Sequence, residues 1–213
     1  MDYSIILIII LSYLIGSISG GVVVGKIKNT DIRKKGSKAA GATNALRTMG
    51  AMFALAVLII DVYKGYFAVE YIPNLFNNDN DTTMKALAGI MCIVGHVYPL
   101  YFKFKGGKGV GTALGALIAF PELLPLIGIA FASWLVIIIT TGYVGLSSIL
   151  ATLSVPILYI ITEKVICNEM VISTLIISLF IVFTHRENIK RMLNRKENRF
   201  EKVMLINLFN KNK

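Results

Sequence analysis

The chain has 213 residues, of which 55% are hydrophobic and 16% are charged, and its mean hydropathy is +0.70. A soluble domain of this size cannot cover so much apolar surface, so a water-soluble enzyme is excluded, as are a disordered chain and a collagen-like chain. The 22 Lys and Arg residues outnumber the 12 Asp and Glu residues and give a formal net charge of +10.

The N-terminal segment begins with Met-Asp-Tyr-Ser, and its acidic residue does not fit the basic start of a secretory signal peptide. We therefore expect a retained transmembrane helix from Ser4 to Val24. A crossing needs about 20 mostly apolar residues. Runs of this kind predict an all-α, polytopic integral membrane protein with about seven transmembrane helices, near 4–26, 51–72, 84–102, 109–120, 123–141, 143–162 and 169–185.

The fourth run, 109–120, is short, and Pro121, Glu122 and Pro125 separate it from the fifth. It is a candidate half-helix or re-entrant element. Charge supports seven crossings, because 19 of the 22 basic residues fall within 26–47, 103–108 and 186–213. Cytoplasmic loops collect Lys and Arg, and seven crossings with the N-terminus outside place all three segments in the cytoplasm.

No internal repeat or low-complexity segment divides the chain. We therefore expect residues 1–213 to form a single membrane domain. Its cytoplasmic parts would be the loops 27–50 and 103–108 and the tail 186–213, and its C-terminus would be cytoplasmic.

The first cytoplasmic loop combines glycines with hydroxyl, amide and basic side chains, at Gly36, Ser37, Lys38, Gly41, Thr43, Asn44, Arg47 and Gly50. Glycines let backbone N–H groups approach an anion closely, and the polar side chains add donors and charge. The loop therefore suits a phosphate. An ordinary basic loop that only sets the topology remains an equal alternative.

The loop Lys105-Gly-Gly-Lys-Gly109 comes directly before an apolar helix. Exposed amides, ammonium groups and a helix N-terminus can converge there on one anion. Phe102 occupies the place of the first glycine of a Walker A loop, so that motif is absent. We favour an anion site over an ordinary loop.

Two further clusters contain ionisable groups. Asp61 and Lys64 lie three residues apart inside an apolar run, where they form either an ion pair or a substrate contact. At the end of the last run, His185 and Asn188 share a helix face if the helix continues, although basic residues there also serve as membrane anchors. Cys92 and Cys167 suit small core residues, and neither histidine belongs to a metal motif.

In this order, these motifs resemble the bacterial acyl-phosphate:glycerol-3-phosphate acyltransferase family, called PlsY, of which the chain would be a divergent member. The resemblance covers residues 16 to about 197. It is carried by Gly16-Ser17, Gly36-Ser37, Gly41-Ala-Thr-Asn44 with Arg47 and Gly50, Asp61-Val-Tyr-Lys-Gly65, Gly95-His96 with Pro99, Lys105-Gly-Gly-Lys-Gly-Val110, and His185-Arg-Glu-Asn-Ile-Lys-Arg191.

The sequence departs from the family pattern in two places. Lys38 and Ala39 stand where the family has Gly and Asn, and Lys38 is a candidate for a compensating charge. Gly142 and Gly145 replace an Arg and a Ser of the family pattern, while Tyr143, Leu146 and Ser148 match it. Two polar side chains expected to help bind substrate are therefore missing.

The resemblance implies transfer of a fatty acyl group from acyl phosphate to the 1-hydroxyl of glycerol 3-phosphate, the first acylation step of phospholipid synthesis. It implies an active site on the cytoplasmic face of the bacterial cell membrane. Two phosphate-bearing substrates would account for two Gly-rich basic loops. The main alternative is an organic-anion or phosphate-ester transporter, although a carrier is expected to have repeated halves with charges near the bilayer midplane.

The resemblance also implies roles for individual residues. Lys108 and the amides of residues 106–109 would bind one phosphate, Arg47 and its loop the other, and His185 with Asn188 would orient the acceptor. The predicted catalytic residues are His185, Asn188, Lys108 and Arg47. The predicted substrate-binding residues are Ser37, Gly41, Thr43, Asn44, Lys64, His96, Gly106, Gly107, Gly109 and Ser148. We expect no metal, cofactor or nucleic acid, and as partners both substrates, membrane lipids and the acyl-phosphate-forming enzyme.

Overall fold

The computed structural model describes residues 3–78 and 81–200. The predicted tail 186–213 therefore falls partly outside the described residues. The chain forms two compact units, Met1–Pro121 and Glu122–Lys213. All regular secondary structure within the described ranges is helical, which confirms the predicted all-α class.

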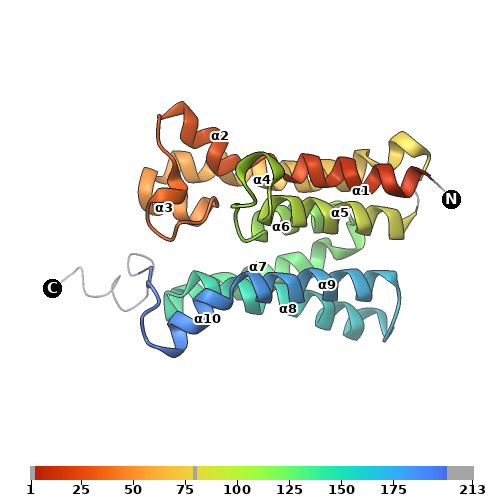
Figure 1. Cartoon of the computed structure of the whole chain (residues 1–213). Coiled ribbons are helices and arrows are strands. Elements are labelled where there is room, and N and C mark those ends of the chain that lie inside the picture. The colour runs from red at the N-terminus through yellow and green to blue at the C-terminus, as the bar shows by residue number, and fades with distance from the viewer. Residues whose placement is uncertain (1–2, 79–80, 201–213) are drawn as a thin grey trace. The chain divides into compact units, whose positions relative to one another are not determined.

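The first unit contains six α-helices in the described residues: α1 (Tyr3–Gly16), α2 (Gly20–Ile27), α3 (Ala42–Met49), α4 (Ala51–Tyr71), α5 (Thr82–Val97) and α6 (Val110–Ile118). α1 packs along α5, and α4 packs against α6 and α5 (Figure 1). Gly16 and Gly95 permit the close approach of α1 and α5, since a Cβ at either would overlap a backbone carbonyl of the other helix.

The predicted first span, 4–26, is broken between α1 and α2. The break exposes backbone carbonyls that would otherwise accept hydrogen bonds within the helix. The Lys64 ammonium on α4 uses them, because Nζ donates to the carbonyl oxygens of Gly16 at 3.0 Å and Ile18 at 2.7 Å. A buried cation on α4 therefore replaces the helical hydrogen bonds that are lost.

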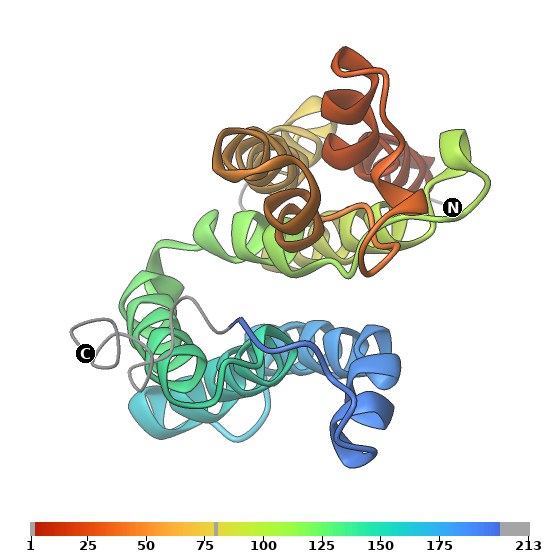
Figure 2. The same cartoon turned by 90° about the vertical axis from the view of Figure 1, so that its left-hand side faces the viewer.

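The second unit contains α7 (Leu124–Thr141), α8 (Val144–Glu163), α9 (Glu169–Thr184) and α10 (Arg186–Leu193) among the described residues. α8 packs against both α7 and α9. α10 lies at the end of this unit where α7 ends and α8 begins (Figure 1). The axes of α9 and α10 differ by 53° (Figure 2), so the last apolar helix does not continue straight through His185.

Five helical stretches of the described residues are long and apolar enough to cross a membrane, and α9 with α10 makes a sixth if the bent pair is one span. α6 has nine residues and rises only about 14 Å, against a hydrocarbon core of about 30 Å. The short fourth run therefore forms a helix too short to cross alone, in agreement with the predicted half-helix. Large apolar side chains such as Met52, Val136 and Leu179 are exposed on the helices, as lipid contact requires.

Candidate active site

The first Gly-rich loop is held in shape by the buried side chain of Asn44. Its Nδ2 donates to the carbonyl oxygens of Ile32, Lys35 and Ala39 at 2.9, 3.1 and 2.9 Å. Its Oδ1 accepts from the backbone N–H of Ser37 at 2.9 Å. Asn44, predicted to contact substrate, thus braces the loop from inside.

Part of this loop is a helix that the sequence analysis did not predict. α3 begins after Gly41 and ends before Gly50, and these two glycines were the available signal for its ends. Arg47 lies in the last turn of α3, and Thr43 lies in the first. Both side chains are half-buried, whereas Ser37 is exposed.

The two Gly-rich loops lie side by side at one end of the first unit (Figure 1). The Ala40 N–H donates to the Gly106 carbonyl oxygen at 3.2 Å. Arg33, which the sequence analysis did not single out, donates from Nη1 to the Phe102 carbonyl oxygen at 3.2 Å. The two loops are therefore tied together by backbone acceptors.

Arg33 is itself oriented by Asp31, through Nε–Oδ1 and Nη2–Oδ2 hydrogen bonds of 2.9 and 3.0 Å. The hydrogen bond from the Arg33 guanidinium holds the pKa of the Asp31 carboxyl below its ordinary value. A carboxylate that stays ionised keeps the paired bond to Arg33 and so keeps the link between the loops.

The second Gly-rich loop folds back onto the end of α5. The N–H groups of Gly106 and Gly107 donate to the carbonyls of Val97 and His96, each at 3.2 Å. Gly109, in a left-handed conformation with φ +88°, is the residue from which α6 begins. The first N–H groups of α6 have no acceptor within the helix, and Lys108 precedes them, so positive charge gathers there.

A buried cluster of three ionisable side chains lies next to this loop. Asp61 and Lys64 form the ion pair that was one of the two predicted alternatives, with 3.0 Å between Oδ1 and Nζ and side chains only 4% and 5% exposed. Lys64 Nζ also lies 2.8 Å from His96 Nδ1. We infer that Nδ1 accepts from the ammonium and that the neutral ring carries its proton on Nε2.

His96 in turn restricts which residue the loop can have at position 107, because a Cβ at Gly107 would overlap His96 Nε2. Lys64 and His96 therefore act first as internal supports of the loop. Their predicted direct contact with substrate stays a prediction.

In the second unit, His185 lies at the junction of α9 and α10 and is buried. Its Nδ1 is 2.8 Å from the Ile181 carbonyl oxygen, which requires the proton on Nδ1, so that Nε2 is an acceptor when the ring is neutral. Asn188, also buried, donates from Nδ2 to Glu197 Oε1 at 2.8 Å. Glu197 Oε2 lies 2.7 Å from Arg191 Nε. Glu197 was not predicted from the sequence, although an acidic residue within a basic tail was an available signal.

The structure shows what surrounds the two glycines that depart from the family pattern, Gly142 and Gly145. A Cβ at Gly145 would lie 3.0 Å from Asn188 Nδ2, so a serine there would crowd the amide. Gly142 ends α7 with φ +73°, a conformation that an arginine adopts only with strain. Ser148 is buried, donates to the Val144 carbonyl at 2.9 Å and lies 3.3 Å from Trp134 Nε1, so its hydroxyl joins α7 to α8.

Metal ligands do not gather in the described residues, where no group of three or more His, Cys, Asp and Glu side chains could hold an ion. The two Gly-rich loops carry backbone N–H groups, Lys and Arg side chains. These groups suit the stabilisation of negative charge.

Residues 6–195 match the family model described as "Glycerol-3-phosphate acyltransferase". The glycerol-3-phosphate acyltransferase of Aquifex aeolicus (strain VF5) is 37% identical over 193 residues, which cover 91% of this chain and 97% of the relative. Two crystal structures of PlsY (YgiH), an integral membrane glycerol 3-phosphate acyltransferase, each share 35% identity and cover 92% of this chain.

The first of these structures is the glycerol 3-phosphate form, with a TM-score of 0.82 and 96% of its chain covered. The second is the lysophosphatidic acid form, with a TM-score of 0.80 and 95% covered. Together with the apolar helices, these similarities establish a multi-pass membrane protein. They support an acyltransferase and give no support to the transporter alternative.

Proposed function

This chain belongs to the glycerol-3-phosphate acyltransferase family and is a membrane acyltransferase, and we propose that it transfers a fatty acyl group from acyl phosphate to the 1-hydroxyl of glycerol 3-phosphate. The products are lysophosphatidic acid and inorganic phosphate. One observation carries the proposal. Hydrogen bonds hold the two Gly-rich basic loops together, and the second of these loops leads directly into the N-terminus of α6. The similar structure in its glycerol 3-phosphate form supports this acceptor.

Both substrates carry a phosphate, and each Gly-rich loop binds one. Lys108 and the N–H groups at the start of α6 bind the first phosphate, where charge and the helix N-terminus act together. Arg47, Ser37 and Thr43 bind the second, on the loop that Asn44 keeps in shape. His185 and Asn188 orient the acceptor hydroxyl.

Acyl phosphate is an activated mixed anhydride. The enzyme therefore needs mainly to position the two substrates and to stabilise the negative charge that develops in the transition state. The acceptor hydroxyl oxygen forms a bond to the acyl carbonyl carbon, and the bond from that carbon to the phosphate oxygen breaks. The hydroxyl proton passes to a phosphate oxygen of a substrate. His185 Nε2 is the alternative proton acceptor.

The topology that fits the charges has seven membrane segments, with the N-terminus outside and the C-terminus in the cytoplasm. Its fourth segment is α6, which needs the residues on either side of it to complete the crossing. The chain then works as one membrane domain of the bacterial cytoplasmic membrane. Both Gly-rich loops face the cytoplasm, where glycerol 3-phosphate and the enzyme that forms acyl phosphate reach them.

Purified protein with palmitoyl phosphate and glycerol 3-phosphate should release lysophosphatidic acid and one phosphate per turnover, measured by thin-layer chromatography and a phosphate assay. Lys108→Ala and Arg47→Ala should each lower turnover about 100-fold, the usual effect of removing one charge-stabilising donor. Lys103→Ala, which removes an exposed lysine from the same loop as Lys108, should retain activity.

Absence of lysophosphatidic acid at every pH from about 5 to 9 would contradict the proposed activity. Activity with palmitoyl coenzyme A but not with palmitoyl phosphate would contradict the donor. Unchanged turnover in Lys108→Ala or Arg47→Ala would show that the substituted residue is not part of the active site.

A further inference from the structure

The segment after α10 folds back onto the junction between α7 and α8. The Phe200 N–H donates to the Gly142 carbonyl oxygen at 2.8 Å. Arg199 Nε donates to the Tyr143 hydroxyl at 3.0 Å, and its guanidinium lies 5.1 Å from the centre of the Tyr143 ring. The family match ends at residue 195, so residues 196–200 lie beyond it.

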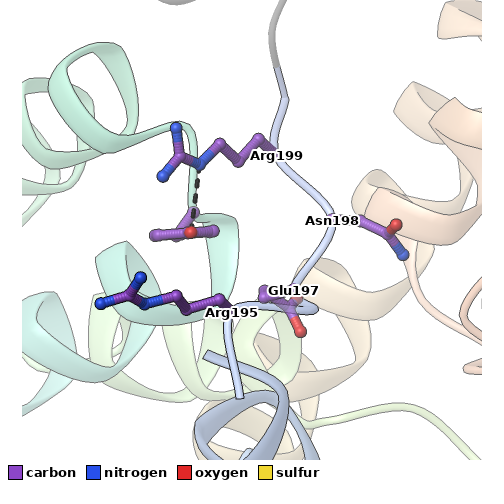
Figure 3. Close-up of a pocket in the computed structure, with 5 residues that line it drawn as sticks. Arg195, Glu197, Asn198 and Arg199 are labelled. Carbon is purple, nitrogen blue, oxygen red and sulfur yellow. Dashed lines mark hydrogen bonds between the residues drawn. The ribbon is translucent and has the colours of Figure 1, made fainter. Parts of the chain in front are cut away.

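A cavity of about 670 Å³ lies at this fold-back, lined by Tyr143, Arg195, Glu197, Asn198 and Arg199. Figure 3 shows that the side chains of Arg195 and Arg199 extend to the same side of the segment, whereas Asn198 extends away from them. Two guanidinium groups therefore share one side of a single cavity.

The described residues of this cavity do not balance its charge. Among them, Glu197 is the one carboxylate that lines the cavity, and both of its oxygens are already engaged, by Asn188 and Arg191. Within residues 3–78 and 81–200, the Arg195 guanidinium makes no hydrogen bond or ion pair. Like charges that share a cavity repel each other, so an anion between them is favoured.

The hydrogen-bonding groups also suit an anion. Arg199 has five N–H donors, and its bond to Tyr143 uses one of them. Since the Tyr143 hydroxyl accepts from Arg199, its own proton is available for donation to a ligand. Guanidinium forks match phosphate oxygens in pairs, which makes such contacts stronger than those of neutral donors.

We propose that Arg195, Arg199 and Tyr143 form a binding site for a terminal phosphate group, built from residues that do not belong to the two Gly-rich loops. The ligand is either free inorganic phosphate or the headgroup of phosphatidic acid, which have the same terminal phosphate chemistry. Because Glu197 joins the segment to Asn188, ligand binding also steadies a residue of the proposed acceptor site. The binding itself does not depend on the proposed reaction.

The test is calorimetric titration of inorganic phosphate into the full-length protein in detergent, in the wild type and in an Arg47→Ala/Lys108→Ala background that removes the basic side chains of both loop sites. Saturable binding should persist in Arg47→Ala/Lys108→Ala. Adding Arg195→Gln/Arg199→Gln should weaken it at least about tenfold. The matched control is Arg186→Gln/Lys196→Gln, which removes the same charge from exposed residues of the same region and should bind as before.

Tyr143→Phe, which removes the hydroxyl donor and its hydrogen bond from Arg199 but keeps the ring, should weaken binding about threefold. Circular dichroism should show native helix content in every variant. A second titration in lipid discs distinguishes the sources: phosphatidic acid in phosphatidylcholine discs should compete with phosphate if the headgroup binds, and should leave it unchanged if free phosphate is the ligand. Absence of saturable binding in Arg47→Ala/Lys108→Ala, or equal binding in the Arg195→Gln/Arg199→Gln variant and its control, would overturn the proposal. Turnover is not needed for any of these outcomes.

Discussion

Asn188 is held in place by a carboxylate from the segment that follows α10. Its amide bonds to Glu197, and Glu197 bonds to Arg191. The amide orientation is therefore set before any substrate arrives, which lowers the cost of orienting an acceptor hydroxyl. In the proposed site, Glu197 is therefore a positioning residue that acts through Asn188.

Glu197→Ala should lower acyl transfer about tenfold, because it removes one hydrogen bond to a charged acceptor. Glu197→Gln should retain more activity than Glu197→Ala, since its Oε1 still accepts from Asn188 although its amide nitrogen cannot accept from Arg191. The decisive comparison is a double-mutant cycle with Asn188→Ala. If Glu197 acts through Asn188, Glu197→Ala should cause no further loss in that background, whereas a fully additive loss would show an independent role.

Lys64 has a structural role, which differs from the substrate contact predicted from the sequence. Its ammonium satisfies two backbone carbonyls and Asp61 in a buried position. Lys64→Met leaves the Asp61 carboxylate buried without its cation, which costs about 3–5 kcal/mol. The midpoint of thermal unfolding in detergent should fall clearly for Lys64→Met and less for Asp61→Asn/Lys64→Met. An equal fall in both would mean that the charge pair is not the cause.

At the scale of elements, the loop before α6 depends on the residue that it covers. A Cβ at Gly107 would overlap His96 Nε2. His96 cannot move aside easily, because it is buried and contacts Lys64. The shape of the loop that we propose to bind phosphate is therefore coupled to the buried cluster next to it.

Gly107→Ala should displace the loop and lower turnover at least about 100-fold, an effect of the size seen when a single charge-stabilising donor is lost. Gly128→Ala is the control, because a Cβ at Gly128 on α7 meets no atom within 4 Å. This control should keep full turnover, measured with palmitoyl phosphate. Normal turnover in Gly107→Ala would show that the loop tolerates a shift and that its backbone is not the critical element.

At the scale of the whole molecule, the side of the membrane on which each loop lies is open to a direct test. The structure gives one exposed cysteine, Cys167 in the connection between α8 and α9, and one buried cysteine, Cys92, among the described residues. With the N-terminus outside and seven crossings, this connection lies outside the cell.

A membrane-impermeant maleimide added to intact cells should therefore label Cys167. Cys167→Ser should abolish the label, because Cys92 is inaccessible. Labelling that requires permeabilised cells would contradict the proposed orientation and place the α8–α9 connection in the cytoplasm.

Hydrophobic runs and charge were sufficient to predict a helical membrane protein, because bilayer crossings demand long apolar segments and backbone groups satisfied within the helix. Glycine spacing and basic residues likewise identified the two loops, since these local features carry their own chemistry. The break at residues 17–19 and the bend at His185 were not predictable in this way. They depend on partners far away in the chain, such as Lys64.

By itself, the sequence determined the class of protein, its family and the residue types available to bind phosphate. Only the tertiary structure decided which polar groups are already used: Asn44 braces its loop, Ser148 joins two helices, and Glu197 holds Asn188. The reason is physical, because hydrogen bonds and ion pairs join residues that are distant in sequence, whereas hydropathy and glycine content act locally. A motif therefore indicates where charge can gather, and packing determines which side chains remain to meet a substrate.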